Sequence, residues 1–422
     1  MDGFVVNRVL MVAFHYPPQR GSSGIQRTLA FARQLPQHGW EPIILTASRC
    51  AYPAVSEVQA DDPEHVYRSL ALDSARHLAL RGRYPAWLAR PDRWASWWFS
   101  AVPRGLALIR RYRPRAIWST YPIATAHMIA LTLHRLTGLP WIADNRDPLT
   151  DTDYPPDPRT RAIHLWLERR TLRDAEALVC TTPGAIRDWA ARYADSAPHH
   201  RALIENGYDE QAFADAAPDQ PCRRAAGAPF RLLHSGLVYP SERDPTQLFA
   251  ALSALRHEGS ISARTFRLML RASGHEQLLA RLIGEFGIAD LVELGAPLAY
   301  RAALAEMLSA DGLLLLQGAN CNAQIPAKLY EYLRAQRPIL ALTDPAGDTA
   351  SALRQAGINT IGRLDCSEDA NAAIRNFLRL CGAGLAPQTS PAHVLAQERS
   401  ARSRQLAFLL DQIAARQERD RQ

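Results

Sequence analysis

The sequence predicts an α/β protein of two doubly wound domains in series, each built around a parallel β-sheet. At 422 residues the chain is too long for one ordinary hydrophobic core and suits two domains of about 200 residues each. Short apolar runs alternate with amphipathic helical patterns, which is typical of parallel sheets covered on both faces. The alternation stops at an Ala/Pro/Asp-rich stretch between residues 214 and 229, which has the composition of a linker, and then restarts.

The first half of the chain contains six strand-like runs. They lie at Val5–Phe14, Pro42–Thr46, Ala116–Thr120, Trp141–Asp144, Leu178–Thr181 and Leu203–Glu205. Helical patterns lie between several of them, for example at Ile25–Leu35 and Arg159–Arg173. These elements predict a first doubly wound domain over residues 1–214.

The second half repeats the alternation and predicts a second domain over residues 229–394. Its expected strands are Phe230–Ser235, Phe266–Arg271, Leu291–Leu294, Gly312–Leu316 and Ile339–Leu342. Its expected helices are Pro245–Arg256, Glu276–Phe286, Tyr300–Leu308 and Pro326–Ala335. Residues 395–422 form a charged amphipathic helix that we expect to pack back to the domain junction. Two such domains leave a cleft, where ligands bind at the carboxyl ends of the strands.

The composition of the chain indicates the cellular compartment in which we expect the protein. Hydrophobic residues make up 47% and charged residues 22%, as in an ordinary globular protein. Met1 is followed by Asp2 and then by a strand-like run, and no stretch reaches the length of a membrane span. The six cysteines show neither a C-x-x-C pair nor metal-ligand spacing. We therefore expect a cytoplasmic protein without a metal site, bound at most to the inner face of the membrane.

The net charge of +7 is concentrated in one segment. Between Arg81 and Arg115 there are nine arginines and one acid, interleaved with four tryptophans (Trp87, Trp94, Trp97 and Trp98). Arginine and tryptophan at helical spacing suit an anionic membrane surface. The alternative is a packed aromatic cluster surrounded by solvated arginines, and both interpretations stay open. Nucleic acid is disfavoured, because the aromatics are too clustered for a base-stacking track.

A loop rich in proline, glycine and serine joins the first strand to the first helix. It contains Gly21, Ser22 and Gly24, and the helix starts directly after them. Glycines let the backbone approach a ligand closely, and the helix N-terminus offers free N–H groups to an anion. A tight turn without a ligand explains the same composition.

The most informative block surrounds Lys328, at the expected start of a helix. Pro326 sets the helix start, and Glu331 lies on the same face of the first turn as Lys328. A cation beside free N–H groups suits a diphosphate, and a carboxylate one turn later can accept from ribose hydroxyls. Lys328 is the only lysine of the chain, since the other 48 basic residues are all arginine. A compact point charge is therefore expected to be needed there, although a simple surface pair with Glu331 is the alternative.

With these residues the chain resembles the retaining family-four glycosyltransferases of the GT-B fold, especially the bacterial polysaccharide and lipid-linked glycan group. The matching pieces follow family order: His15–Pro18 with its Gly-rich loop, Trp141–Pro148, Ile204–Asp209, His234–Gly236, Arg243–Pro245 and Pro326–Leu342. The resemblance implies two Rossmann-like doubly wound domains facing a cleft. The N-terminal domain would hold the acceptor and the C-terminal domain the nucleotide sugar.

The resemblance also assigns residues. It places Glu331 on the donor ribose and Lys328, Ile325 and Pro326 at the donor phosphates and sugar. Gly236 and Arg243 fall beside the diphosphate, and the loop with Gly21, Ser22 and Gly24 resembles the loop that closes over the donor. Arg146 and Asp147 fall on the acceptor side of the cleft, where catalytic roles are expected together with Lys328.

The chain departs from the family at one position. The first glutamate of the family's motif would fall at residue 323, which is alanine here. The implied reaction is transfer from a nucleotide diphosphate sugar, with retention, to a hydroxyl of a glycan or lipid-linked acceptor. No cofactor or metal is expected, because Lys328 and Arg243 can neutralise the leaving diphosphate. A nucleotide-sugar 2-epimerase of the same fold and a catalytically silent sugar-nucleotide-binding partner remain as alternatives.

Overall fold

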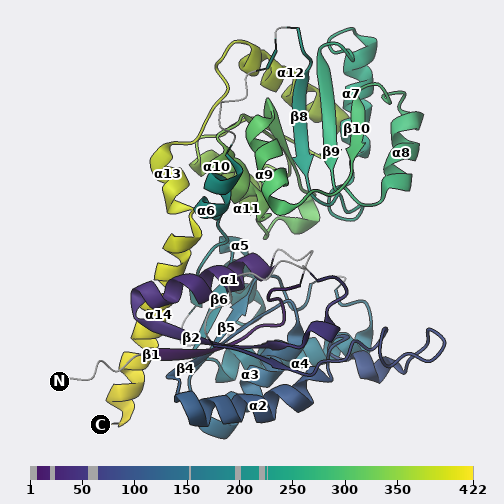
Figure 1. Cartoon of the computed structure of the whole chain (residues 1–422). Helices are drawn as coiled ribbons and strands as arrows, with labels where there is room; N and C mark the ends of the chain where they lie inside the picture. Colours follow the sequence, from purple (N-terminus) through teal and green to yellow (C-terminus); the bar gives the residue numbers. More distant parts are fainter. Residues whose placement is uncertain are drawn as a thin grey trace. The chain divides into compact units, whose positions relative to one another are not determined.

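The structure is a computed structural model that describes residues 7–19, 24–55, 65–151, 154–194, 201–217, 224–225 and 227–421. The chain forms two compact units (Figure 1). The N-terminal unit combines residues 1–206 with residues 399–422, and the C-terminal unit comprises residues 207–398. The chain therefore passes between the units twice, and each unit is described by itself.

The N-terminal unit contains a seven-stranded sheet in which neighbouring strands all pair in parallel. Its strand order is β3-β2-β1-β4-β5-β6-β7, so the order reverses between β1 and β4. The strands are β1 (Asn7–Val12), β2 (Trp40–Ala47), β3 (Val66–Ser69), β4 (Ala116–Thr120), β5 (Trp141–Asn145), β6 (Ala177–Cys180) and β7 (Arg201–Leu203).

Helices cover both faces of this sheet (Figure 1). One face packs against α2 (Trp97–Tyr112), α3 (Ala124–Thr137), α4 (Pro158–Asp174) and α5 (Pro183–Arg192). The other face packs against α1 (Gly24–Gln34), a short 3-10 helix at Leu35–His38 and α14 (Arg399–Arg421). The start of α4 shows why these elements form where they do. The Asp157 side chain accepts from the Thr160 backbone N–H at 2.8 Å, and proline occupies the first helical position.

The C-terminal unit contains a second parallel sheet, of six strands in the order β10-β9-β8-β11-β12-β13. The order reverses between β8 and β11. The strands are β8 (Phe230–Ser235), β9 (Phe266–Arg271), β10 (Val292–Gly295), β11 (Gly312–Leu316), β12 (Ile339–Leu342) and β13 (Ile361–Gly362).

Two layers of helices cover the second sheet. On one face lie α7 (Thr246–His257), α8 (Glu276–Glu285) and α12 (Ser367–Gly382). On the other face lie α6 (Glu210–Ala216), α9 (Tyr300–Ser309), α10 (Lys328–Ala335), α11 (Asp348–Gln355) and α13 (Pro391–Ala396). Two doubly wound sheets in one chain are the architecture of a GT-B fold, which confirms the fold predicted from the sequence.

The boundaries between the units follow packing and differ from those expected from composition. Helix α6 belongs to the C-terminal unit, although it begins before residue 214, because Phe213 is buried in a core cluster with residues of α9 and α10. Helix α14 belongs to the N-terminal unit: Leu406, Leu410 and Ile413 are buried in the same cluster as Phe31 of α1.

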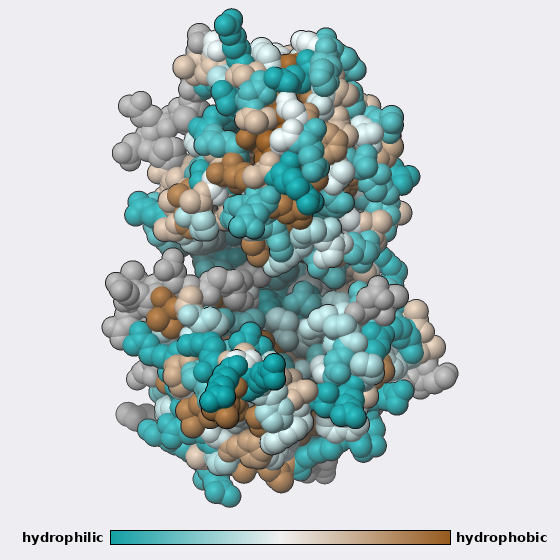
Figure 2. All heavy atoms as spheres, turned by 90° about the vertical axis from the view of Figure 1, so that its right-hand side faces the viewer, coloured by the Kyte–Doolittle hydropathy of each residue, from teal (hydrophilic) through white to brown (hydrophobic). Residues whose placement is uncertain are grey.

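The surface carries scattered apolar side chains, and Figure 2 shows hydrophobic residues among hydrophilic ones on both units. Across the described part of the chain, every helix is too short or too polar to span a membrane. The apolar run at Pro122–Leu133 lies largely within α3, whose residues from Ala124 to Leu133 contribute to the core of the N-terminal unit.

Candidate functional site

Doubly wound sheets bind ligands at the carboxyl ends of their strands, beside the point where the strand order reverses. In the C-terminal unit that point lies between β8 and β11. Gly236 follows β8 directly, and Lys328 begins the helix that follows β11. In the N-terminal unit Arg146 and Asp147 follow β5, one strand from the reversal beside β4. The predicted residues thus lie where each sheet can bind a ligand.

Lys328 is held by a buried histidine at the end of β8. Its Nζ lies 3.0 Å from His234 Nε2, and His234 Nδ1 donates to the backbone oxygen of Leu314 at 2.9 Å. Because that carbonyl fixes the proton on Nδ1, Nε2 accepts from the ammonium group. Burial and the charge of Lys328 lower the pKa of His234 well below its usual value. The imidazole is therefore neutral and orients Lys328.

Arg243 places a second positive charge near Lys328. Burial and the charge of Arg243 lower the pKa of Lys328 well below its usual range, while Glu331 opposes this shift. The Arg243 guanidinium donates to the Leu237 backbone oxygen at 2.9 Å and lies over the Tyr239 ring. Its Nε is buried and has no hydrogen-bond partner among the described residues. Two cations and a buried N–H without an acceptor favour the binding of an anion.

Gly236 allows the loop after β8 to approach Lys328. Its φ is +109°, and a Cβ at this position would lie 3.2 Å from Lys328 Nζ. The loop is fixed at two points: the Ser235 N–H donates to Tyr332 Oη at 2.9 Å, and the Gly236 N–H donates to the Arg271 backbone oxygen at 2.8 Å. The backbone beside the ammonium group is therefore preorganised, and a larger side chain would disturb it.

Glu331 lies in the first turn of α10 with Lys328. Its Oε1 accepts from Tyr300 Oη at 2.8 Å. A carboxylate oriented by a tyrosine can accept hydrogen bonds from the two hydroxyls of a ribose. The structure thus brings Lys328, Glu331, Gly236 and Arg243 together within the C-terminal unit.

Side-chain hydrogen bonds fix the loop that joins β11 to α10. The buried Gln317 side chain donates to the Gln324 backbone oxygen at 3.0 Å, and Thr349 Oγ1 donates to Gln317 Oε1 at 2.6 Å. Ala323 lies within this loop and has no carboxylate to offer to a sugar. These hydrogen bonds position the start of α10 independently of any ligand.

The residues directly before α10 are packed into the unit. Ile325 is buried in a core cluster with Leu329, and the Pro326 backbone oxygen accepts from the Leu329 N–H at 2.9 Å. Because the Ile325 side chain packs in the core, only the backbone of these residues is available at the start of the helix.

In the N-terminal unit, Arg146 lies against the start of α1. Its Nε donates to the Tyr121 backbone oxygen at 2.8 Å, and a Cβ on Gly24 would lie 2.5 Å from its Nη2. Gly24 therefore permits the close approach of this guanidinium group. Burial and the charge of Arg146 lower the pKa of His15 to about 3, so His15 is neutral at physiological pH.

Two acids on and after β5 have different environments. Asp147 is exposed. Asp144 is fully buried, and its oxygens accept from the Arg27 guanidinium at 2.7 and 3.0 Å and from Thr120 Oγ1 at 3.1 Å. Asp144 is thus a structural residue. Gly21 and Ser22, also predicted to bind the donor, lie outside the described residues.

Sequence reasoning missed the residues that orient the site: His234, Tyr300 and Tyr332. His234 was noted only as part of a motif, and the two tyrosines only as members of helical patterns. One signal was present, because a histidine follows two leucines near the end of β8, directly before Ser235 and Gly236. Its partner Lys328 is 94 positions away, so only the fold reveals their contact.

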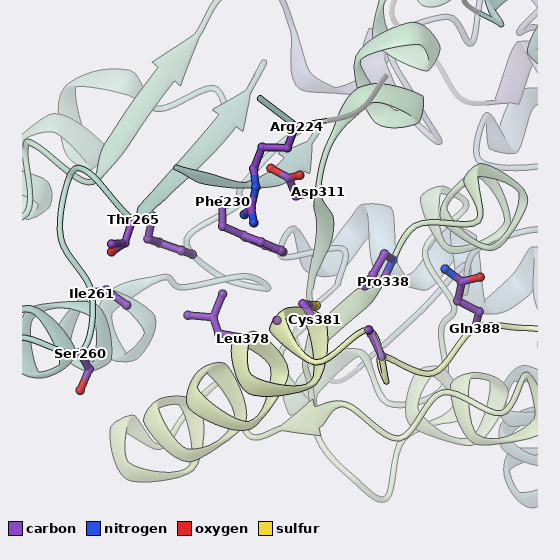
Figure 3. Close-up of a pocket in the computed structure, with 14 residues that line it drawn as sticks. Arg224, Phe230, Ser260, Ile261, Thr265, Asp311, Pro338, Leu378, Cys381 and Gln388 are labelled. Carbon is purple, nitrogen blue, oxygen red and sulfur yellow. The ribbon is translucent and has the colours of Figure 1, made fainter. Parts of the chain in front are cut away.

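A separate cavity of about 550 Å³ lies at the opposite end of the second sheet. Its lining includes Phe230 and Phe266, which begin β8 and β9, and Asp311, which precedes β11. Figure 3 shows these strand starts together with Arg224, whose guanidinium lies 5.8 Å from the Phe230 ring centroid. The amino ends of parallel strands are not where doubly wound folds bind their ligands, so this cavity is not the candidate site.

Comparisons with known proteins identify the architecture. Residues 23–207 match the family described as "Glycosyl transferase 4-like domain". Among solved structures, sucrose-phosphate synthase from Thermosynechococcus elongatus superposes with a TM-score of 0.65 at 14% identity, over 98% of both chains. The Anabaena protein HepE in complex with UDP and glucose gives 0.62 at 13% identity, over 96% of this chain and 100% of that one.

A further similar structure is the lipopolysaccharide outer core galactosyltransferase WaaB, with a TM-score of 0.59 at 10% identity over 95% of this chain and 99% of that one. No curated protein matches the chain by sequence. Identities this low show the fold alone, whereas the domain match assigns residues 23–207 to a described family. Residues 23–207 therefore form a glycosyl transferase 4-like domain, within a chain that has the GT-B fold.

Proposed function

We propose that this enzyme transfers a sugar from a nucleoside diphosphate sugar to a hydroxyl group of a lipid-linked or polysaccharide acceptor, with retention at the anomeric carbon. The observation that supports donor binding is that two cationic side chains, Lys328 and Arg243, lie near each other. The buried Nε of Arg243 also lacks an acceptor in the described structure. A diphosphate is the ligand that such a pair fits. HepE, of similar fold, binds UDP and UDP-glucose, so UDP is the first nucleotide to test.

In this proposal the C-terminal unit holds the donor. Lys328 Nζ, oriented by His234, and the Arg243 guanidinium bind the diphosphate oxygens, and Glu331 accepts from the ribose hydroxyls. As transfer proceeds, the bond from the anomeric carbon to the diphosphate oxygen breaks and the bond to the acceptor oxygen forms. The acceptor hydroxyl gives its proton to an oxygen of the leaving diphosphate, on which negative charge grows. The two cations stabilise that charge without having to reorganise.

Residues of the N-terminal unit are proposed to serve the acceptor. Arg146 is fixed by the Tyr121 backbone oxygen, and Asp147 is exposed beside it in sequence. A neutral His15 can donate or accept a hydrogen bond near Arg146. These residues are suited to orient an acceptor hydroxyl, in keeping with the role that the family resemblance implies for this domain.

The proposal includes catalysis without a metal ion, because Lys328 and Arg243 supply the charge that a metal would otherwise provide. Turnover in excess chelator is expected to stay within a few-fold of turnover in magnesium. A complete loss of turnover on chelation, restored by added metal, would contradict this part of the proposal.

A panel of nucleotide sugars, assayed for nucleotide release with and without a lipid-linked acceptor, tests the whole proposal. Acceptor-dependent release of a nucleoside diphosphate is the expected result. Acceptor-independent conversion would indicate an epimerase or hydrolase, and nucleotide binding without any turnover would indicate a silent partner. Arg243→Gln should weaken nucleotide binding, and Arg267→Gln, which changes an exposed arginine on β9, is its matched control.

A further inference from the structure

We propose that residues 78–99 of the N-terminal unit, hereafter the docking segment, bind the protein to the surface of an anionic lipid membrane. The segment lies between β3 and α2, includes the first three residues of α2, and belongs entirely to the N-terminal unit. It projects from that unit as a dark blue loop (Figure 1). This inference does not rest on the donor site, since the two use residues of different units.

The tip of the docking segment is a tight turn. Leu80 and Arg83 exchange two backbone hydrogen bonds, of 2.8 and 3.0 Å. Arg81 and Gly82 between them both have positive φ, at 50° and 76°. The turn closes the tip on itself, so its side chains point outward and not into the core. A protruding turn of this kind can reach a flat surface that the rest of the domain does not touch.

Large apolar side chains are exposed along the segment. Leu80 is 81% exposed, Trp87 67% and Phe99 73%. Single exposed apolar residues are ordinary, but three on one short segment indicate an interaction surface. Trp87 and Phe99 also line a cavity of about 260 Å³ together with other apolar residues, among them Leu88, Pro91, Trp98 and Met128. The cavity is thus continuous with the exposed surface and can receive a hydrocarbon chain.

The arginines of the segment differ in whether they already form ion pairs. Arg90 lies 3.2 Å from Asp157, and Arg93 lies 2.7 Å from Asp73, so both are used in ion pairs. Arg81 and Arg83 are exposed, and their guanidinium groups have no partner in the described part of the chain. The cations available at the tip are therefore Arg81 and Arg83.

The tryptophans divide in the same way. Trp97 is fully buried in the core of the N-terminal unit, and Trp94 and Trp98 pack against that core. Trp87 alone of the four is largely exposed. The packed aromatic cluster therefore describes Trp94, Trp97 and Trp98. We propose the membrane surface only for the residues around Trp87.

An anionic bilayer is the occupant that this chemistry fits. Two exposed guanidinium groups beside Leu80, without a partner among the described residues, match a boundary where phosphate lies next to hydrocarbon. Arginine can extend its charge to the headgroups while its apolar stem stays against the acyl chains. Figure 2, which views the side from which the segment projects, shows strongly hydrophilic and hydrophobic residues next to each other on the N-terminal unit. A nucleic acid would leave Leu80 and Phe99 without an apolar partner.

Co-sedimentation of the full chain with vesicles tests the proposal. Vesicles of phosphatidylcholine alone are compared with vesicles that also contain phosphatidylglycerol. Binding is expected only to the anionic vesicles, and it should weaken at high salt because exposed charges are screened. The double variant Arg81→Gln/Arg83→Gln should reduce partitioning about tenfold or more. Leu80→Ser/Trp87→Ser should also reduce it, by removing the inserted side chains.

Matched controls change equally exposed residues elsewhere. Arg231→Gln/Arg267→Gln removes two exposed arginines of the C-terminal unit, and Leu385→Ser removes a leucine that is 67% exposed. These variants should bind vesicles like the wild type. UDP titration and thermal unfolding verify that every variant is folded.

Equal binding to neutral and anionic vesicles, or no binding to either, overturns the inference. The same holds if the docking variants sediment like the controls, or if they lose self-association instead of vesicle binding. The last outcome would assign the segment to contacts between copies of the chain. None of these outcomes affects the donor site, because UDP binding is measured separately.

Discussion

Lys328 shows how one side chain can define a site. Its ammonium group lies against a neutral His234 and near Arg243, so it is held in a place where positive charge is disfavoured until an anion arrives. A bound diphosphate would reverse that situation by stabilising the charged form. The free energy of this stabilisation is part of the binding free energy, which makes donor affinity depend on the protonation of Lys328.

We predict that Lys328→Ala and Glu331→Ala each weaken UDP binding about tenfold or more, since each removes a charge-assisted hydrogen bond of about 1.5–3 kcal/mol. The pKa of Lys328 in the free protein is lowered, so the ammonium loses its proton as pH rises through that value. Wild-type affinity should therefore fall with rising pH. Lys328→Arg should bind more weakly, because a planar fork replaces a point charge, but its affinity should not fall in this way.

Calorimetric titration of UDP over a range of pH checks this prediction. The nucleotide itself gains negative charge on deprotonation, and that effect is common to both proteins. The difference between wild type and Lys328→Arg therefore isolates the lysine. Identical pH profiles and affinities for all the variants would remove Lys328 from the donor site.

A second prediction concerns Gly236. Alanine there has to adopt a φ of +109°, and its Cβ would lie 3.2 Å from Lys328 Nζ. Strain of this kind amounts to about 1–3 kcal/mol, so Gly236→Ala should lower the free energy of unfolding and weaken UDP binding. Gly284→Ala is the control, because a Cβ on that helical glycine meets nothing within 4 Å. It should be neutral or stabilising. Both are measured by urea unfolding and UDP titration.

For individual residues, the sequence predicts which side chains form the candidate site better than it predicts which side chains contact each other. The single lysine and its spacing to Glu331 follow from the printed order of residues, and the structure brings both to the same helix start. The neutral partner His234 could not be predicted, because it joins β8 to α10 across the fold. Gly24 was predicted for its backbone freedom, but its contact with Arg146 depends on how β5 and α1 pack.

At the scale of elements, strands that are central in a sheet were the easiest to predict. The bounds of β4, β8, β9, β11 and β12 agree with the predicted runs. The predictions missed β3 and β13, each of which lies at one edge of its sheet. Edge strands are short and half-exposed, so Val66–Ser69 lacks the continuous apolar run of a buried parallel strand.

Helix α14 stabilises a unit to which it is distant in sequence. Leu410 is fully buried against the first sheet, and Asp411 Oδ1 accepts from Trp40 Nε1 at 2.8 Å. We predict that Leu410→Ala lowers the free energy of unfolding of the N-terminal unit by about 2–5 kcal/mol, because it leaves a cavity. Phe408→Ala is the matched control on the same helix. Phe408 is 64% exposed, so its removal should change stability by less than about 0.5 kcal/mol.

Denaturant unfolding followed by far-UV circular dichroism measures both variants. Equal stability of Leu410→Ala and Phe408→Ala would mean that α14 is not packed on the sheet. A loss confined to Leu410→Ala would assign the C-terminal helix to the N-terminal unit in solution.

At the scale of the whole molecule, the order of the chain and the order of the units differ. The C-terminal unit is one continuous stretch, residues 207–398, whereas the N-terminal unit is assembled from residues 1–206 and 399–422. Composition located a break near residue 214 but could not show that the last helix returns to the first domain. That return depends on which sheet the apolar face of α14 packs against. Both α1 and α14 have an apolar face, and both pack in the same core cluster with the first sheet.

This arrangement predicts how the protein can be divided. A fragment of residues 207–398 retains a complete six-stranded sheet, both of its helix layers and the residues Lys328, Arg243, Glu331 and His234. It should therefore fold cooperatively and bind UDP. A fragment of residues 1–206 lacks α14 and exposes the apolar surface that Leu406, Leu410 and Ile413 cover, so it should be unstable or aggregate. Adding residues 399–422 through a short linker should restore it. Thermal unfolding and UDP titration of the three fragments distinguish the outcomes. A stable fragment 1–206 would contradict the role of α14, and a folded fragment 207–398 without affinity for UDP would contradict the assignment of the donor site to the C-terminal unit.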